Sequence, residues 1–197
     1  MTRQSFSRET RNPARASRLT SLILDLIPAA LLYPLFCVGI ALGAPPSGAC
    51  DIPQDLQREI VRKYPGEKLV QHSDLGEYDR KLFQEHHGKS CPGAVRINFY
   101  GDGKPTWALV LITGENPKRR AELVVAHLVD QGWETRILET TDGTPVIWPE
   151  KPGKYEDLNG EKTIRASRPV IIFAGLESWA IVYAWNGKAV EKVQVSD

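Results

Sequence analysis

A group of carboxylate and imidazole side chains lies between residues 74 and 87. The group consists of Asp74, Glu77, Asp79, Glu85, His86 and His87. Imidazole and carboxylate groups are zinc ligands, but a zinc site needs three or four of them converging on one point. Adjacent histidines on a helix point in different directions, and the spacing matches no metal-binding motif. We therefore interpret the group as the solvated end of a helix, and we predict neither a metal site nor a cofactor.

Nucleophilic catalysis has little support in the sequence. Cys91 follows His86 and His87 closely, and a thiol beside an imidazole is one way to activate a nucleophile. The chain has no Gly-x-Ser-x-Gly turn, which holds the nucleophile of many hydrolases. It also has no glycine-rich phosphate loop of the usual spacing. We predict no catalytic residue.

A disulfide is the alternative role for Cys91. Of the three cysteines, Cys37 lies in an N-terminal apolar run, so Cys50 and Cys91 remain after export. An even count of cysteines in an oxidising compartment favours a disulfide. We predict the Cys50–Cys91 bond. Two unrelated thiols, or a lipidated Cys50 beside a free Cys91, are the alternatives.

The segment 98–106 has the spacing of a cation-binding loop. Asn98, Asp102 and Thr106 surround two glycines, and the apolar run 107–112 follows. The segment resembles the Asp-x-Asn-x-Asp-Gly-x-x-Asp calcium loop of extracellular FG-GAP and VCBS-type β-repeats. Asn98, Tyr100 and Thr106 stand at ligand positions of that loop, and Asp102 alone keeps a carboxylate. Because calcium prefers six to eight oxygens, several from carboxylates, we interpret the segment as a degenerate, structural turn. The resemblance implies an exported bacterial β-protein.

Aromatic residues are the best candidates for a binding surface. The set comprises Trp133, Trp148, Tyr155, Trp179, Tyr183 and Trp185. Aromatic residues on strands usually belong to the core, and we expect this of Trp107 and Trp179. Exposed ones can hold a glycan or protein partner. Residues 140–161 are rich in Gly, Pro and Asp and predict a loop, so we predict a binding surface at Trp148 and Tyr155. The alternative is that residues 146–148 form a short buried strand.

Periodicity places these residues on a mostly β framework. A helix is expected from 52 to 64, with Leu56, Ile60 and Val61 as its apolar stripe, and a second one within 75–87. Alternation predicts strands at 94–100, 106–113, 121–129, 133–139, 169–174, 178–185 and 189–195. For the strand at 121–129, the alternative interpretation is a helix over 118–129. Asn186-Gly187 indicates a hairpin with a type I′ turn.

The predicted fold class is mainly β (α+β). It consists of antiparallel hairpins and a meander of about seven or more strands behind one or two N-terminal helices. The strand 106–113 is apolar on both faces, which is typical of a central strand covered on both sides.

Residues 1–44 differ from the rest of the chain. Five arginines occupy the first eighteen residues, and an uncharged apolar run, 26–44, follows. This pattern predicts a signal peptide, with Ala41-Leu42-Gly43 as a small-x-small cleavage site. The alternative is a retained anchor, because the run is close to the ~20 residues that span a bilayer. Either way, residues 45–197 form a single exported domain.

Removal of the leader leaves 20 basic and 22 acidic residues, a net charge of −2. This charge argues against nucleic acid as a partner. We predict an exported, non-catalytic binding or structural protein of the bacterial cell envelope, with an unknown protein or glycan partner. The alternatives are a cell-envelope hydrolase and a membrane-tethered inhibitor or assembly factor. The predicted location is periplasmic or secreted, or the inner membrane if residues 26–44 remain as an anchor, which would be the only membrane contact.

Overall fold

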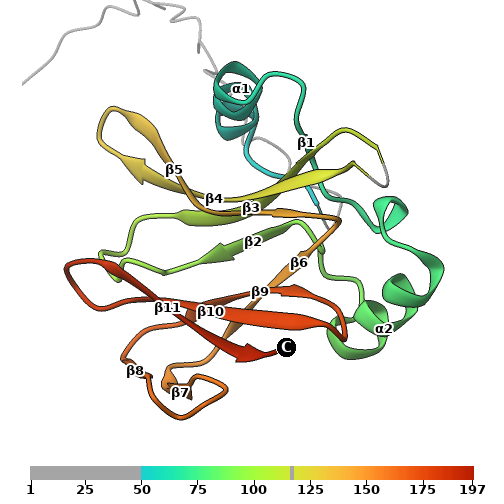
Figure 1. Cartoon of the computed structure of the whole chain (residues 1–197). Helices are drawn as coiled ribbons and strands as arrows, with labels where there is room; N and C mark the ends of the chain where they lie inside the picture. Colours follow the sequence, from blue (N-terminus) through green and yellow to red (C-terminus); the bar gives the residue numbers. More distant parts are fainter. Residues whose placement is uncertain (1–49, 116–117) are drawn as a thin grey trace, which may run out of the picture. The chain divides into compact units, whose positions relative to one another are not determined.

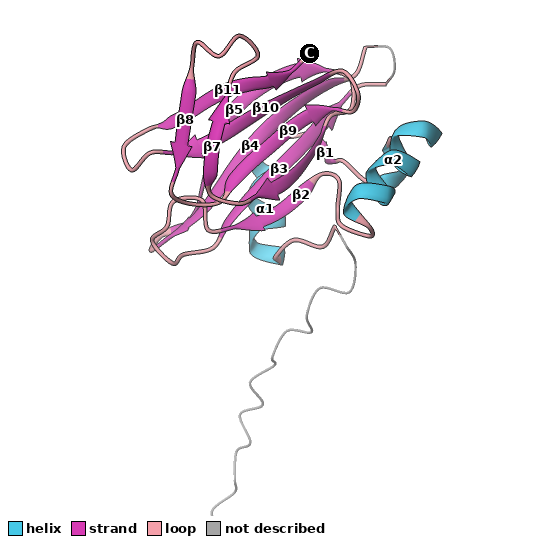
Figure 2. Cartoon of the chain, turned by 90° about the horizontal axis from the view of Figure 1, so that it is seen from below, coloured by secondary structure: helices cyan, strands magenta, loops and turns pink. Residues whose placement is uncertain are grey.

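The structure, a computed structural model, describes residues 50–115 and 118–197, which all belong to one compact unit. The predicted leader and anchor, residues 1–44, lie outside the described residues. The described part of the chain has eleven strands: a five-stranded and a four-stranded antiparallel sheet that pack face to face, and a separate two-stranded hairpin (Figures 1 and 2). The prediction of a mainly β fold with N-terminal helices is confirmed.

Two α-helices precede the main strands. Helix α1 (Gln54–Lys63) follows Pro53 and buries Leu56 and Ile60, one turn apart, whereas Val61 is exposed and lies outside the expected stripe. A short 3-10 helix, η1 (His72–Asp74), leads to α2 (Glu77–His87), which buries Phe83 and ends at Gly88 with a positive φ. A glycine tolerates this conformation at a helix end without steric cost.

The first sheet contains β1 (Lys68–Leu69), β2 (Ala94–Ile97), β3 (Thr106–Thr113), β4 (Arg120–Val129) and β5 (Gly132–Asp142). Strand β3 pairs with β4 on one side and with both β1 and β2 on the other. Ala108, Val110 and Ile112 face the core between the sheets, while Leu109 and Leu111 pack beneath α1. This confirms β3 as a doubly covered strand, and β4 is a strand rather than a helix.

The second sheet has the order β11–β10–β9–β6. Its strands are β6 (Val146–Glu150), β9 (Val170–Gly175), β10 (Trp179–Trp185) and β11 (Val190–Ser196). In β10, Tyr183 faces the core between the sheets, whereas Val182 and Ala184 face outward. A hairpin of β7 (Gly153–Glu156) and β8 (Thr163–Ala166) contributes Ile164 and Tyr155 to the cluster on that outer face.

The expectation that residues 140–161 form a loop is wrong. Strand β5 continues to Asp142, and the segment then contains β6 and β7. The alternative, a short strand at residues 146–148, is confirmed: β6 pairs with β9 along its whole length, and Val146 and Ile147 are buried in the core between the sheets. Pro149 is tolerated because β6 is an edge strand, where a missing N–H removes no ladder bond. The glycines and prolines of this segment therefore mark tight connections between short strands.

The turn at Asn186-Gly187 is a hairpin connection, but it is not type I′. A type I′ turn needs positive φ at both central residues. Gly187 has φ 97°, whereas Glu177 is the only non-glycine residue with positive φ in the described ranges. Instead, the Asn186 side-chain oxygen accepts hydrogen bonds from the backbone N–H of Lys188 and of Ala189.

The predicted disulfide is present between Cys50 and Cys91, with a Cα–Cα distance of 4.8 Å. Both cysteines pack into the cluster beneath α1. The bond therefore ties the segment that leads into α1 to the segment that leads into β2. None of the helices formed by the described residues has the length and apolar character that crossing a membrane requires.

Candidate functional site

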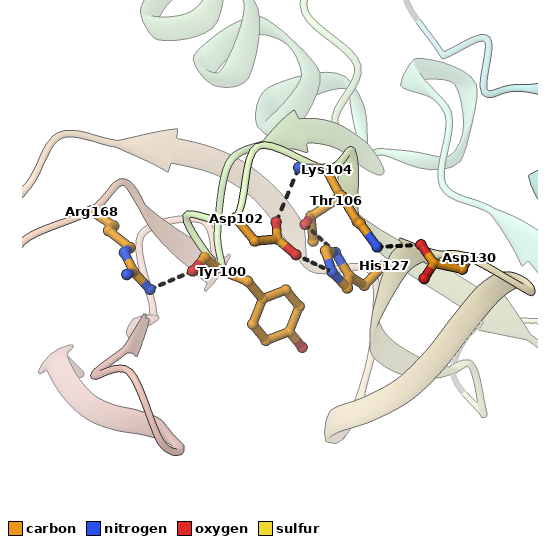
Figure 3. Close-up of polar contacts among 7 residues, drawn as sticks. All are labelled: Tyr100, Asp102, Lys104, Thr106, His127, Asp130 and Arg168. Atoms are coloured by element: carbon orange, nitrogen blue, oxygen red, sulfur yellow. Dashed lines mark hydrogen bonds and ion pairs between the residues drawn. The ribbon is translucent and has the colours of Figure 1, made fainter.

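The loop between β2 and β3, residues 98–105, is held in place by its own polar groups and by two distant elements (Figure 3). One oxygen of Asp102 accepts a hydrogen bond from the Lys104 backbone N–H at 3.0 Å, which closes a local turn. The other oxygen lies 2.9 Å from His127 Nε2. The Lys104 ammonium pairs with Asp130 at 2.7 Å, so the loop is also tied to the β4–β5 turn.

His127 connects this loop to the sheet. The register places it directly opposite Thr106, and its Nδ1 lies 2.9 Å from Thr106 Oγ1. A carboxylate can only accept hydrogen bonds, so Nε2 donates to Asp102. In the neutral ring, Nδ1 then accepts a hydrogen bond from the Thr106 hydroxyl. The result is a hydroxyl–imidazole–carboxylate chain from β3 through β4 to the loop.

The two ends of this chain differ in exposure. Thr106 is fully buried, the His127 side chain is 14% exposed and the Asp102 side chain is 41% exposed. A nucleophilic hydroxyl needs an open approach for its substrate, and Thr106 lacks one. The geometry therefore suits a structural contact that fixes the loop better than it suits a hydrolytic triad. We call the Thr106–His127–Asp102 chain the latch.

The His127 ring of the latch also packs against an aromatic residue, Tyr100, which in turn contacts Trp185. The ring of Tyr100 lies edge-on against His127, with centroids 4.6 Å apart, and edge-on against Trp185, at 5.0 Å. Phe99 packs behind Tyr100 at 5.2 Å and is fully buried. Burial raises the pKa of the Tyr100 phenol. The ring cluster, defined as Tyr100, His127 and Trp185, joins the β2–β3 loop, β4 and β10.

Arg168 secures the same loop from the second sheet's side. Its Nη1 donates a hydrogen bond to the Tyr100 carbonyl oxygen (Figure 3). The Arg168 side chain also lies next to the Gly101 Cα. Gly101 has φ 71°, and a Cβ there would overlap the Arg168 Nε, Cζ and Cδ atoms. The backbone conformation at 101 favours glycine, and a larger residue would also force the Arg168 side chain to move.

A second polar network spans the two sheets. The Tyr183 hydroxyl on β10 donates to Glu139 Oε2 on β5 at 2.7 Å, and the Lys192 ammonium on β11 pairs with the same oxygen. Burial alone would raise the pKa of Glu139, but the hydrogen bonds from Lys192 and Tyr183 outweigh it and lower that pKa. Burial, together with Glu139, raises the pKa of Tyr183.

The predicted binding residues Trp148 and Tyr155 pack against the same apolar cluster, and neither is fully exposed. Both are half-buried against the outer face of the second sheet, and Trp148 also stacks on His87 with centroids 4.6 Å apart. The Tyr155 hydroxyl donates to the Lys151 carbonyl oxygen. Their role as a binding surface stays a prediction. Trp107 and Trp179 are half-buried against the α1 cluster and the core between the sheets, respectively.

The predicted loop residues separate into two groups. Asp102 and Thr106 meet through His127, whereas the Asn98 side chain is exposed and joins none of these bonds. Over residues 50–115 and 118–197, His, Cys, Asp and Glu form no cluster of three or more that could hold a metal. The His/carboxylate group is dispersed, because Asp74 accepts from Lys68 and the Gln71 N–H while His87 packs between Phe83 and Trp148.

Sequence reasoning missed His127, Arg168 and the Glu139–Tyr183 pair. Alternation along 121–129 places His127 on the same face as Leu123 and Val125, so a histidine on a buried face was a readable signal. Arg168 gave no signal, because its partner Tyr100 is 68 residues away. Comparisons with protein-family models, with curated proteins and with solved structures find no match to this chain.

Proposed function

We propose that this chain is an exported, non-catalytic binding protein of the cell envelope. The Cys50–Cys91 disulfide supports the location, because such bonds persist in the periplasm or outside the cell and are rare in reducing compartments. The arginine-rich start and the apolar run 26–44 support the same location. The domain would then act in the periplasm or outside the cell, after export.

The ring cluster is the observation that carries the binding role. Tyr and Trp give a large contact area for little conformational entropy, and their polar edges can still form hydrogen bonds. Tyr100, His127 and Trp185 come from three separate elements and are only partly buried. The latch and Arg168 hold the loop that carries Tyr100, so the surface is organised before a ligand arrives. A protein or a glycan is the proposed partner.

A photo-cross-linker at position 185 tests this proposal. Benzophenone inserts into C–H bonds of either a protein or a glycan, and p-benzoylphenylalanine keeps an aromatic ring at Trp185. After irradiation of living cells we expect an adduct of defined mass at 185 that disappears in a Tyr100→Ala variant. Tyr78, which is 61% exposed on α2, is the matched control position and should give no such adduct. Equal yields at 185 and 78 would contradict a ligand surface at the ring cluster.

The Thr106–His127–Asp102 chain favours a second candidate, a cell-envelope hydrolase. A hydroxyl that donates to an imidazole, itself bound to a carboxylate, is the arrangement of an activated nucleophile. A fluorophosphonate probe, which phosphonylates such hydroxyls by forming an O–P bond with loss of fluoride, distinguishes the hydrolase from the binding protein. We expect no labelling, because Thr106 is fully buried. Labelling of the native protein that is lost in Thr106→Val would overturn the non-catalytic proposal.

A further inference from the structure

Strand β5 forms an open edge of the first sheet. In the described part of the chain, β4 is the only strand that pairs with β5 (Figure 1). Both edge strands of the second sheet are partly covered: the Leu158 N–H donates to the Gln194 carbonyl oxygen on β11, and the Ile147 N–H on β6 donates to the Pro92 carbonyl oxygen. A long unpaired edge is a template for another strand, and proteins usually shield it or use it.

The two faces of β5 carry different side chains. Its register with β4 places Glu134 opposite His127 and Arg136 opposite Val125, on the face toward the second sheet. Trp133, Thr135 and Ile137 lie on the other face, toward α1. A register shift follows Ile137 and leaves Leu138 without a counterpart on β4. The regular part of the edge is therefore Gly132 to Ile137.

We propose that β5 pairs with β5 of a second copy of this chain, antiparallel and centred on Thr135. In such a dimer a two-fold axis places the α1 helices of both copies on the same face of the joined sheet. Residues that stand opposite each other on the two β5 strands must then come from the same face of the strand. A centre at Thr135 sets Glu134 opposite Arg136 of the second copy, twice by symmetry. A centre at Glu134 or at Arg136 would set like charges opposite each other, which is destabilising.

The same register matches the apolar residues on the α1 face. Trp133 then stands opposite Ile137 of the second copy, again twice. Ile137 is 44% exposed in the single chain, so pairing would remove an apolar side chain from water. Trp133 is already fixed, because its Nε1–H donates to Asp55 Oδ2 at 2.8 Å. Charge and apolar complementarity therefore select one register, and a second copy is the occupant that supplies both.

Sedimentation equilibrium of the full, oxidised chain in mild detergent tests the dimer. We expect a reversible dimer whose dissociation constant rises about tenfold in Glu134→Arg and in Arg136→Glu, because each places two like-charged pairs in register. The double variant E134R/R136E exchanges the two charges and should restore native affinity. Arg165→Glu, an exposed strand arginine on β8, is the control and should leave the dimer unchanged.

A cysteine at the axis gives a second, independent readout. Thr135 would face its own copy directly, with Cβ atoms about 4.5–5.5 Å apart, so Thr135→Cys should form an intermolecular disulfide under mild oxidation. Thr113→Cys, exposed at the end of β3, should not. A monomer at all concentrations overturns the proposal, as does a double variant no tighter than the single ones. A dimer that survives the single variants and gives no cross-link at 135 places the interface elsewhere and also overturns it. These measurements report mass and cross-linking, so they are independent of the ligand experiment.

Discussion

Single polar side chains connect parts of this domain that are far apart in the sequence. Asp102 in the β2–β3 loop accepts a hydrogen bond from His127 on β4. Glu139 on β5 accepts hydrogen bonds from Tyr183 on β10 and Lys192 on β11, in the other sheet. A carboxylate that accepts two donors is satisfied while partly buried, whereas losing one partner leaves a polar group without compensation. These residues therefore contribute to stability by holding neighbouring elements in fixed positions.

Glu139 should make the stability of the protein depend on pH in the acidic range. Its pKa is lower in the folded protein than the ordinary value of 4.5. A group of this kind stabilises the fold above its unfolded pKa, and the contribution is lost as the pH falls through the folded pKa. Glu139→Gln should therefore lower the free energy of unfolding at neutral pH, and the difference from the native protein should shrink below pH 4.5. Urea unfolding at a series of pH values measures this difference.

The exposed Glu161→Gln in the β7–β8 connection is the matched control, and its effect should be small at every pH. An equal loss in Glu139→Gln at neutral and acidic pH would show that the side chain acts through packing. The ion pair between Glu139 and Lys192 would then contribute little to the stability of the fold.

At the scale of elements, two glycines in the loop 98–105 allow the energetic cost of backbone strain to be measured separately from the cost of a side-chain clash. Gly101 and Gly103 have φ 71° and 80°, but only Gly101 has a neighbour, Arg168, where a Cβ would lie. Gly103→Ala should cost about 1–2 kcal/mol from the left-handed backbone conformation alone. Gly101→Ala should cost more, because Arg168 must move and give up its bond to the Tyr100 carbonyl oxygen.

A double-mutant cycle with Arg168→Ala checks this reasoning by thermal or urea unfolding. In the Arg168→Ala background, Gly101→Ala should cost no more than Gly103→Ala, since the contact is already gone. If the excess cost of Gly101→Ala persisted in that background, Arg168 would not be what restricts residue 101.

The same scale shows what the sequence could predict. Strand β3 was identifiable because it is apolar on both faces, and β10 because its residues alternate. Strand β6 was only the alternative to a loop, because it is short and contains Pro149, which normally argues against a strand. Trp148 was therefore expected in a loop, although pairing with β9 half-buries it. Local composition reports the connections well, but pairing between distant strands decides which short segments become part of a sheet.

The long-range contacts of the site had the weakest sequence signal. His127 lies 25 residues from Asp102, and Arg168 lies 68 residues from Tyr100. Spacing along the chain indicated a turn at 98–106, and the turn is there, but its partners depend on how β4 and the β8–β9 connection fold back against it. A pattern of residues can thus locate a loop without revealing which side chains hold it.

At the scale of the whole molecule, three apolar clusters lie in successive layers. One is between α1 and the first sheet, one between the two sheets, and one between the second sheet and the β7–β8 hairpin. The core between the sheets includes residues from both, such as Val110 and Phe173, so each sheet needs the other to cover it. The disulfide lies in the α1 layer, where it joins the segment before α1 to the segment before β2.

Removing the disulfide should therefore destabilise the α1 layer first. The bond joins residues 41 apart in sequence, and the chain-entropy estimate for a loop of this length is about 4 kcal/mol. We expect Cys50→Ala/Cys91→Ala to lower the free energy of unfolding by about 3–4 kcal/mol, and reduction of the native protein to do the same. Hydrogen exchange should accelerate most at the amides of α1 and β1, while β9 and β10, which lie in the second sheet, keep their protection. Uniform acceleration across both sheets would mean that the disulfide stabilises the domain as one cooperative unit. No change in either measurement would mean that the layer beneath α1 is held by its apolar contacts alone.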